Sequence, residues 1–240
     1  MCGIAGFNWG DAALIKKMLD CIRHRGPDEE GSYINKNISL GSRRLSIIDL
    51  SRKGRQPIYN EDKSICVVFN GEIYNFQDIK PELESKRHKF YSNTDTEVIV
   101  HSYEEYGLKC FEKFNGMFAI AIWDAKKREL ILARDRLGKK PLYYCNSGKK
   151  FIFASEIKAI LKFDITKIIN ETAVYHYLAY GYTAREESIC MSIRKLEPGH
   201  ALVLKDNSTN INKYWQLDFS KKINNTEDFF AKEILRHLED

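Results

Sequence analysis

The strongest constraint on the fold of this chain is a series of four short apolar runs between residues 117 and 154. Segments rich in Asp, Asn, Gly and Lys, which are typical of turns, separate the runs. Short runs at this spacing predict consecutive antiparallel strands in a β-meander. The four predicted strands are Met117–Trp123, Glu129–Ala133, Pro141–Cys145 and Phe151–Ala154.

The remaining apolar patterns predict further helices and strands. Strands are expected at 38–48, 64–69 and 200–204, and helices at 12–22, 171–180 and after Thr94. Thr94 and Glu97 have the spacing of a capping box, which predicts the start of that helix. Residues 206–210 and 221–225 are polar and are interpreted as loop and linker, and a last amphipathic helix follows them.

Composition limits the class of protein. The chain has 240 residues, of which 43% are hydrophobic and 30% charged, so we expect one large globular domain, or one domain plus part of another. It contains no membrane-length apolar run and no signal peptide, so we expect a cytoplasmic protein that does not enter a membrane. The net charge of +5 comes from basic runs at predicted turns, such as Lys139-Lys140, so we expect no nucleic-acid partner.

The cysteines give little sign of structural cross-links. All six are widely separated, without CxxC or zinc-ligand spacing, and the six histidines form no HExxH-like pair. We therefore expect no disulfide framework and no metal site. Most of the cysteines are interpreted as buried free thiols.

Cys2 is the exception, because it directly follows the initiator Met1. Removal of Met1 would leave a residue that carries both a thiol and a free α-amine. An α-amine has a pKa of about 7.7–8 and can accept the thiol proton, so the chain end would supply both nucleophile and base. The alternative is that a cysteine occupies position 2 by accident.

Three further positions each have a structural and a functional interpretation. Arg44 follows an apolar run and would either extend to solvent or clamp a substrate carboxylate. Asn70-Gly71 is a strong hairpin signal, but a side-chain amide followed by an exposed N–H also suits an oxyanion hole. Asp95 would either stabilise the helix dipole or hold a substrate ammonium. Local sequence leaves each alternative open.

The joint order of the motifs resembles one family. These motifs are MCGIAG at 1–6, RHRGPD at 23–28, RLSI at 44–47, FNGEIYN at 69–75, TDTE at 94–97, NGMFA at 115–119, RDRLGKKPLYY at 134–144 and ASE at 154–156. Together they resemble the N-terminal glutaminase domain of glutamine-dependent asparagine synthetases, a class II glutamine amidotransferase. The resemblance runs from Met1 to about Leu204.

This resemblance implies a fold and a set of roles. The fold would be α+β, a four-layer α-β-β-α sandwich of two antiparallel sheets, as in N-terminal-nucleophile hydrolases. Cys2 would be the nucleophile, and the Asn70 side chain and Gly71 N–H would hold the oxyanion. The remaining residues would bind the substrate glutamine: Arg44 its carboxylate, Glu72 and Asp95 its ammonium group, and Leu45, Ile47 and Ile48 the same pocket.

The resemblance also implies how the activity is used. Residues 1–205 would form the glutaminase domain and residues 206–240 a linker and the first helix of a C-terminal synthetase domain. That domain would bind ATP and magnesium, whereas the glutaminase part needs no cofactor. Its Ser-Gly-Gly-x-Asp-Ser loop is not found here, so we expect a truncated chain, a gene fragment or a glutaminase with a separate synthetase subunit.

Two alternatives to asparagine synthesis remain at this stage. The first is a related amidotransferase that aminates another acceptor, such as a sugar carboxylate in surface-polysaccharide synthesis. The second is a glutamine-sensing module without activity, which the complete set of site residues disfavours. A homodimer is possible in either case.

Overall fold

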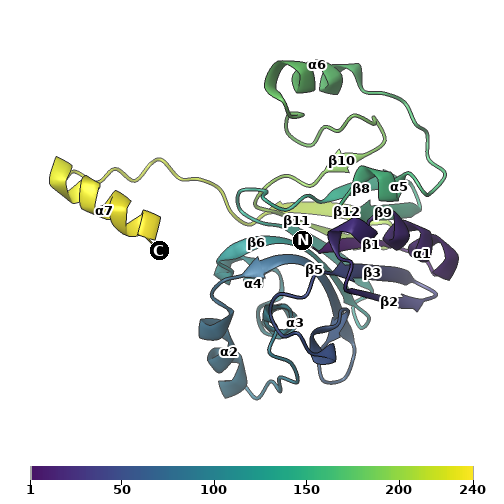
Figure 1. Cartoon of the computed structure of the whole chain (residues 1–240), viewed down its shortest axis with the longest axis horizontal. Helices are drawn as coiled ribbons and strands as arrows, with labels where there is room; N and C mark the ends of the chain where they lie inside the picture. The colour runs from purple at the N-terminus through teal and green to yellow at the C-terminus, as the bar shows by residue number, and fades with distance from the viewer. Residues whose placement is uncertain (1, 240) are drawn as a thin grey trace.

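Two six-stranded antiparallel sheets form the centre of the molecule (Figure 1). The computed structural model describes residues 2–239. In spatial order, sheet A contains β10 (Arg194–Lys195), β8 (Tyr143–Ser147), β9 (Lys150–Ala154), β1 (Gly3–Phe7), β3 (Ile38–Arg44) and β2 (Glu29–Asn35). Sheet B contains β12 (Ser208–Lys213), β11 (His200–Lys205), β7 (Glu129–Arg134), β6 (Gly116–Asp124), β5 (Ile65–Ile73) and β4 (Ile58–Tyr59).

Helices cover the outer face of each sheet. Against sheet A lie α1 (Ala12–Cys21), whose first turn is capped by the Asp11 side chain, and α5 (Ile157–Ile160). Against sheet B lie α2 (Phe76–Ser85), α3 (Asp95–Tyr106) and α4 (Cys110–Lys113). Short 3₁₀ turns occur at Arg23–Arg25, Arg52–Gly54 and Gly107–Lys109.

Strand periodicity explains the layers. In β1, Ile4 belongs to the apolar layer between the sheets, whereas Ala5 belongs to the layer under α1. In β5, Val68 belongs to the layer between the sheets and Val67 to the layer under the sheet B helices. Because successive side chains point to opposite faces, each central strand is apolar on both sides. The predicted α-β-β-α sandwich is therefore confirmed.

The expected single meander over residues 117–154 is wrong in one respect. All four strands form, but β6 and β7 pair in sheet B, while β8 and β9 pair in sheet A. The chain changes sheets in the segment between β7 and β8. Apolar runs predict strands, but the same runs fit one sheet or two packed face to face.

Asp135 organises the crossing between the sheets. Its buried carboxylate accepts hydrogen bonds from four backbone N–H groups, those of Phe118, Leu137, Lys139 and Lys140, at 2.9–3.1 Å. The neighbouring Arg134 donates to the carbonyl oxygens of Gly138, Lys140 and Leu196. These bonds satisfy the backbone of a loop that lies partly inside the protein.

The capping-box prediction is correct for the helix start and wrong for its hydrogen bonds. Helix α3 begins at Asp95, but the Thr94 side chain makes no capping bond within the described chain. Glu97 instead accepts from the backbone N–H groups of Tyr91 and Ser92. Its carboxylate thus fixes the segment that precedes the helix.

The segment 206–210, interpreted as loop, forms part of a hairpin instead. Strand β12 pairs with β11 from Lys205↔Ser208 to His200↔Lys213, so sheet B extends beyond residue 205. Polar residues are compatible with an edge strand whose outer side faces solvent, which is why their composition was misleading. The predicted division into domains at residue 205 stays a prediction.

Two helices stand apart from the sandwich (Figure 1). Helix α6 (Glu171–Tyr180), predicted to be capped by Asn170 or Thr172, is capped by Asn170 and leaves several aromatic side chains exposed. Helix α7 (Glu227–Glu239) follows an extended segment, and none of its described residues is buried. Over residues 2–239, no helix is both long enough and apolar enough to cross a membrane.

Replacing Asp135 tests whether its carboxylate stabilises the loop that connects the two sheets. Asp135→Ala leaves four backbone N–H groups without their acceptor, so we expect the free energy of unfolding to fall by about 3 kcal/mol or more. Urea denaturation measures this. The control, Lys139→Ala, removes an exposed side chain from the same loop and should change stability by less than about 0.5 kcal/mol. Equal effects of the two variants would contradict the assignment.

Candidate active site

Cys2 lies at the start of a strand that is held on both edges. Gly3 of β1 pairs with Arg43 of β3, and Ala5 pairs with both Gly41 of β3 and Ala154 of β9. The Arg25 side chain donates to the Cys2 carbonyl oxygen at 2.9 Å. Pairing of this kind fixes a residue near a chain end, where fraying is the usual behaviour.

The Cys2 thiol rests against the backbone of Leu45. The Leu45 N–H donates to Sγ at 3.4 Å, and Sγ lies 3.7 Å from the Leu45 carbonyl oxygen. Burial raises the pKa of the Cys2 thiol, so a nearby base is needed to form the thiolate. Met1 lies outside the described residues, and its removal and the role of the freed α-amine stay predictions.

A cavity joins Cys2 to almost every residue that the sequence predicted for the site. It is lined by the predicted residues Cys2, Arg44, Leu45, Ile47, Ile48, Gly71, Glu72 and Asp95. Four residues that sequence reasoning missed complete the lining: Gln56, Phe69, Thr94 and Thr96. The two threonines flank Asp95 in the motif, which was their only local signal. Gln56 accepts a hydrogen bond from the Phe69 N–H at 2.7 Å and had no such signal.

The Asn70-Gly71 pair does not form a hairpin turn. Strand β5 continues through both residues, with Asn70 opposite Ala119 and Gly71 opposite Phe118 of β6. Glycine is required here because a Cβ at position 71 would lie 2.0 Å from the Met117 carbonyl oxygen. The structural alternative left open by the sequence is therefore wrong.

The side chain of Asn70 is unusual. It is fully buried, and neither its amide nitrogen nor its amide oxygen has a hydrogen-bond partner within residues 2–239. Asn70 is not itself among the described cavity-lining residues, but its two chain neighbours are. A buried amide without partners costs about 1–3 kcal/mol, so its presence beside the cavity requires an explanation.

Arg44 is buried and holds one wall of the cavity. Its guanidinium donates to the Glu29 carboxylate at 2.7 Å and to the carbonyl oxygens of Ile48 and Asp49 at 2.9 and 2.6 Å. Gly54 allows this position, since a Cβ there would lie 2.4 Å from the Arg44 Nη2. The interpretation of Arg44 as a solvent-directed side chain is wrong. Three of its five N–H donors are used in these bonds.

Two carboxylates lie together on another side of the cavity. The buried Asp95 accepts from the Ile73 N–H at 2.9 Å. Burial raises the pKa of Asp95 to about 7, and the nearby Glu72 charge contributes to the rise. Burial also raises the pKa of Glu72, against the opposing effect of the Lys140 charge. A cation bound between these carboxylates would favour their ionised forms.

Lys140 is a site neighbour that sequence reasoning misplaced. It was expected in a solvated turn, but it is 5% exposed, because Asp135 and Arg134 draw its loop inward. Burial lowers the pKa of Lys140, and the nearby Arg25 charge lowers it further. The charges of Glu72 and of the Cys2 thiolate oppose this lowering of the Lys140 pKa, so Lys140 lies within electrostatic reach of both groups.

Comparison with known proteins identifies the family. The model of a glutamine amidotransferase domain matches residues 1–215. The chain belongs to this family. Asparagine synthetase [glutamine-hydrolyzing] 3 of Bacillus subtilis is 36% identical over 96% of the chain and 39% of its own length. A putative asparagine synthetase of Methanocaldococcus jannaschii is 40% identical over 93% of the chain and 48% of its own length.

A solved structure agrees with the fold. The glutamine phosphoribosylpyrophosphate amidotransferase of B. subtilis matches with a TM-score of 0.66 and 19% identity, over 90% of this chain and 50% of that one. The amidotransferase domain thus spans less than half the length of the two synthetases and half of the solved chain. The resemblance inferred from the motif order is confirmed.

The raised pKa of Asp95 predicts a pH-dependent cost to stability. The Asp95 carboxyl binds its proton more tightly in the folded than in the unfolded state. Its contribution to the free energy of unfolding is therefore present at low pH and is lost between about pH 4 and 7. Asp95→Asn keeps an acceptor for Ile73 and removes the charge. We expect it to raise the free energy of unfolding at pH 8 by up to about 4 kcal/mol, with no gain at pH 4.

Urea denaturation at the two pH values measures this gain. Asp78→Asn is the matched control, since Asp78 is an exposed acid in the first turn of α2 and should gain nothing. A gain from Asp95→Asn that is equal at both pH values would contradict the assignment.

Proposed function

We propose that this amidotransferase domain hydrolyses glutamine to glutamate and ammonia, with Cys2 as the nucleophile. The observation that carries the proposal is the cavity, which is lined by the Cys2 thiol, the Arg44 guanidinium and the carboxylates of Glu72 and Asp95. A free α-amino acid has a carboxylate and an ammonium group at one end. The cavity therefore has complementary charges for both groups. The Cys2 thiol remains available to attack the side-chain amide.

Each residue then has a role in binding. The two unused N–H donors of Arg44 would bind the α-carboxylate of glutamine. Glu72 and Asp95 would bind the α-ammonium, whose charge would offset the burial and the nearby Glu72 charge that raise the pKa of Asp95. Leu45, Ile47 and Ile48 would contact the apolar methylenes of the substrate.

The reaction would proceed in two halves. The α-amine of Cys2 takes the thiol proton, Sγ attacks the amide carbon, and the negative charge moves to the amide oxygen. The Asn70 side chain and the Gly71 N–H would stabilise this oxyanion, which accounts for an amide kept buried without a partner. The α-ammonium returns the proton to the amide nitrogen, and collapse then releases ammonia and leaves a thioester. Water hydrolyses the thioester through a second oxyanion, which gives glutamate and the free thiol.

We further propose that the ammonia serves asparagine synthesis from aspartate. Two relatives named as asparagine synthetases support aspartate as the acceptor of the ammonia. Each is at least twice as long as the part that matches this chain. The chain after strand β12 would lead toward a synthetase domain that binds ATP and magnesium, in the same chain or on a separate subunit. The exposed apolar side chains of α7 fit such a neighbour. A cytoplasmic location and a homodimer remain predictions.

The nucleophile is tested with a glutamine-analogue diazo-ketone. Intact-mass spectra should show loss of Met1 and one adduct on Cys2, and Cys2→Ala should abolish both the adduct and glutamate release. Cys21→Ala is the control, because Cys21 is the other cysteine that is not fully buried, and it should label normally. Glutamate release by a form that retains Met1 would contradict the role of the α-amine.

The oxyanion role of Asn70 is tested by steady-state kinetics. Asn70→Ala should lower kcat for glutamine hydrolysis by about 10²–10³-fold and change KM by only a few-fold, because the donor acts in the transition state. Asn93→Ala, in an exposed position before α3, should keep normal kinetics. A rise in KM with unchanged kcat would assign Asn70 to substrate binding instead.

A further inference from the structure

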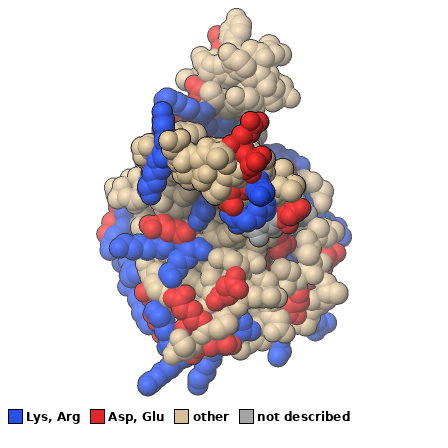
Figure 2. Space-filling model, turned by 90° about the vertical axis from the view of Figure 1, so that its left-hand side faces the viewer, with Lys and Arg blue, Asp and Glu red and all other residues tan. Residues whose placement is uncertain are grey.

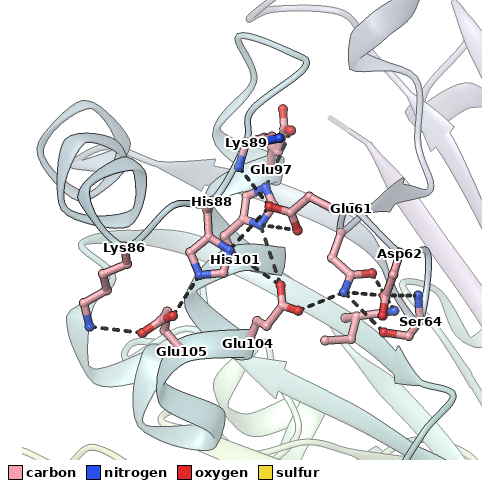
Figure 3. A network of polar contacts seen from close by, with 12 residues as sticks. Glu61, Asp62, Ser64, Lys86, His88, Lys89, Glu97, His101, Glu104 and Glu105 are labelled. Atoms are coloured by element: carbon pink, nitrogen blue, oxygen red, sulfur yellow. Dashed lines mark hydrogen bonds and ion pairs between the residues drawn. The ribbon is translucent and has the colours of Figure 1, made fainter.

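A second cluster of polar side chains lies around α3 (Figure 3), and its four residues are not among those that line the cavity. His101 and Glu104 occupy one face of the helix, His88 follows α2, and Glu61 lies in the turn between β4 and β5. One ligand atom of each residue lies within 4.8 Å of the others. No short motif joins these four positions, so sequence reasoning expected no metal site.

His101 is the member that requires an explanation. It is 0% exposed, and neither of its ring nitrogens has a hydrogen-bond partner within the described part of the chain. Its Nδ1 is directed at the cluster, 3.7 Å from Glu61 Oε2 and 3.9 Å from Glu104 Oε2. A buried imidazole with two unsatisfied nitrogens is costly unless something absent from the protein atoms binds it.

The second imidazole faces the same point. His88 Nδ1 lies 3.6 Å from Glu104 Oε2 and 3.7 Å from Glu61 Oε1, and its side chain is 9% exposed. The two rings lie 4.8 Å apart. These nitrogen–oxygen separations are too long for hydrogen bonds. They are close to the roughly 3.4 Å between ligands that a tetrahedral ion with bonds of about 2.0–2.1 Å requires.

The outer contacts orient the four donors. His88 Nε2 lies 3.0 Å from Glu105 Oε1, and His101 Nε2 lies 3.7 Å from Glu97 Oε1, so a carboxylate backs each imidazole. Glu104 uses its other oxygen to accept from Asn60, and Glu61 accepts from the Lys89 N–H. Carboxylates behind metal-binding histidines and hydrogen bonds to the ligand carboxylates are the usual surroundings of a metal ion.

We propose that Glu61, His88, His101 and Glu104 bind one divalent transition-metal ion, with Zn²⁺ as the expected ion. Two neutral imidazoles favour zinc over magnesium or calcium, and the two carboxylates neutralise its charge. Four protein donors leave no open position, so the ion is structural rather than catalytic. It joins the turn after β4, the segment after α2 and helix α3, whose first residue is Asp95 of the cavity.

Metal binding to the full chain tests the proposal. All proteins carry Cys2→Ser, because a terminal cysteine can itself bind zinc, and any affinity tag is cleaved off before chelator treatment. Calorimetric titration with Zn²⁺ at pH 7.5 should give one ion per chain, while Mg²⁺ and Ca²⁺ should give no saturable binding. Added Zn²⁺ should also raise the melting temperature.

Variants show which residues bind the ion. His88→Gln and Glu104→Gln should each weaken Zn²⁺ binding by about 100-fold or more and abolish the rise in melting temperature. Glu105→Gln, which acts through His88, should weaken binding by about 10-fold. His176→Gln is the matched control, because His176 pairs with one carboxylate, Glu187, at 2.9 Å, and it should bind zinc normally.

Two results would overturn the proposal. One is the absence of saturable Zn²⁺ binding below about 100 μM, and the other is equal affinity in His88→Gln, Glu104→Gln and the parent. Either result would make the cluster a network of imidazoles and carboxylates that binds no metal ion. Glu104 is partly exposed and its replacement by glutamine keeps its size, so this variant carries the test even where His88→Gln fails to fold.

Discussion

The structure depends on the pairing of β1 along both of its edges. This strand follows Cys2 directly, and its hydrogen bonds to β3 and β9 hold a chain end in the middle of a sheet. Strand β5 of the other sheet packs against β1, which brings Phe69 and Gly71 to the cavity that the thiol lines. A thiol on a free terminus would move with it, whereas the Cys2 thiol is placed by two sheets packed face to face.

The cavity keeps several polar groups in states that are unfavourable without a ligand. Asp95 and Glu72 repel one another in a buried place, and the Asn70 amide has no partner among the described residues. Basic groups, Arg44 and Lys140, lie around the same space. A buried carboxyl group with a raised pKa and a buried amide without a partner reduce stability and are typical of functional sites, where a substrate completes the interactions. On the face shown in Figure 2, by contrast, acidic and basic side chains are interspersed.

Helix α3 links the cavity to the second polar cluster. Its first residue is Asp95, and two turns later His101 and Glu104 face Glu61 and His88. Glu97 lies between these groups and fixes the chain before the helix through the N–H groups of Tyr91 and Ser92. An ion at the cluster would therefore stabilise the element that carries the buried acid of the cavity.

The sequence by itself determined most of the strands and helices and eight of the twelve described residues that line the cavity. Apolar periodicity is a local property, which is why it predicts strands and helices. The order of the motifs suggested the roles proposed for Cys2, Arg44 and Asp95. Only the tertiary structure decided that β8 and β9 leave the sheet of β6 and β7, that β12 extends sheet B, and that β5 runs straight through Asn70-Gly71. It also decided that Lys140 is buried and that His88 and His101 meet. These features arise from contacts between residues far apart in the chain, which local patterns do not encode.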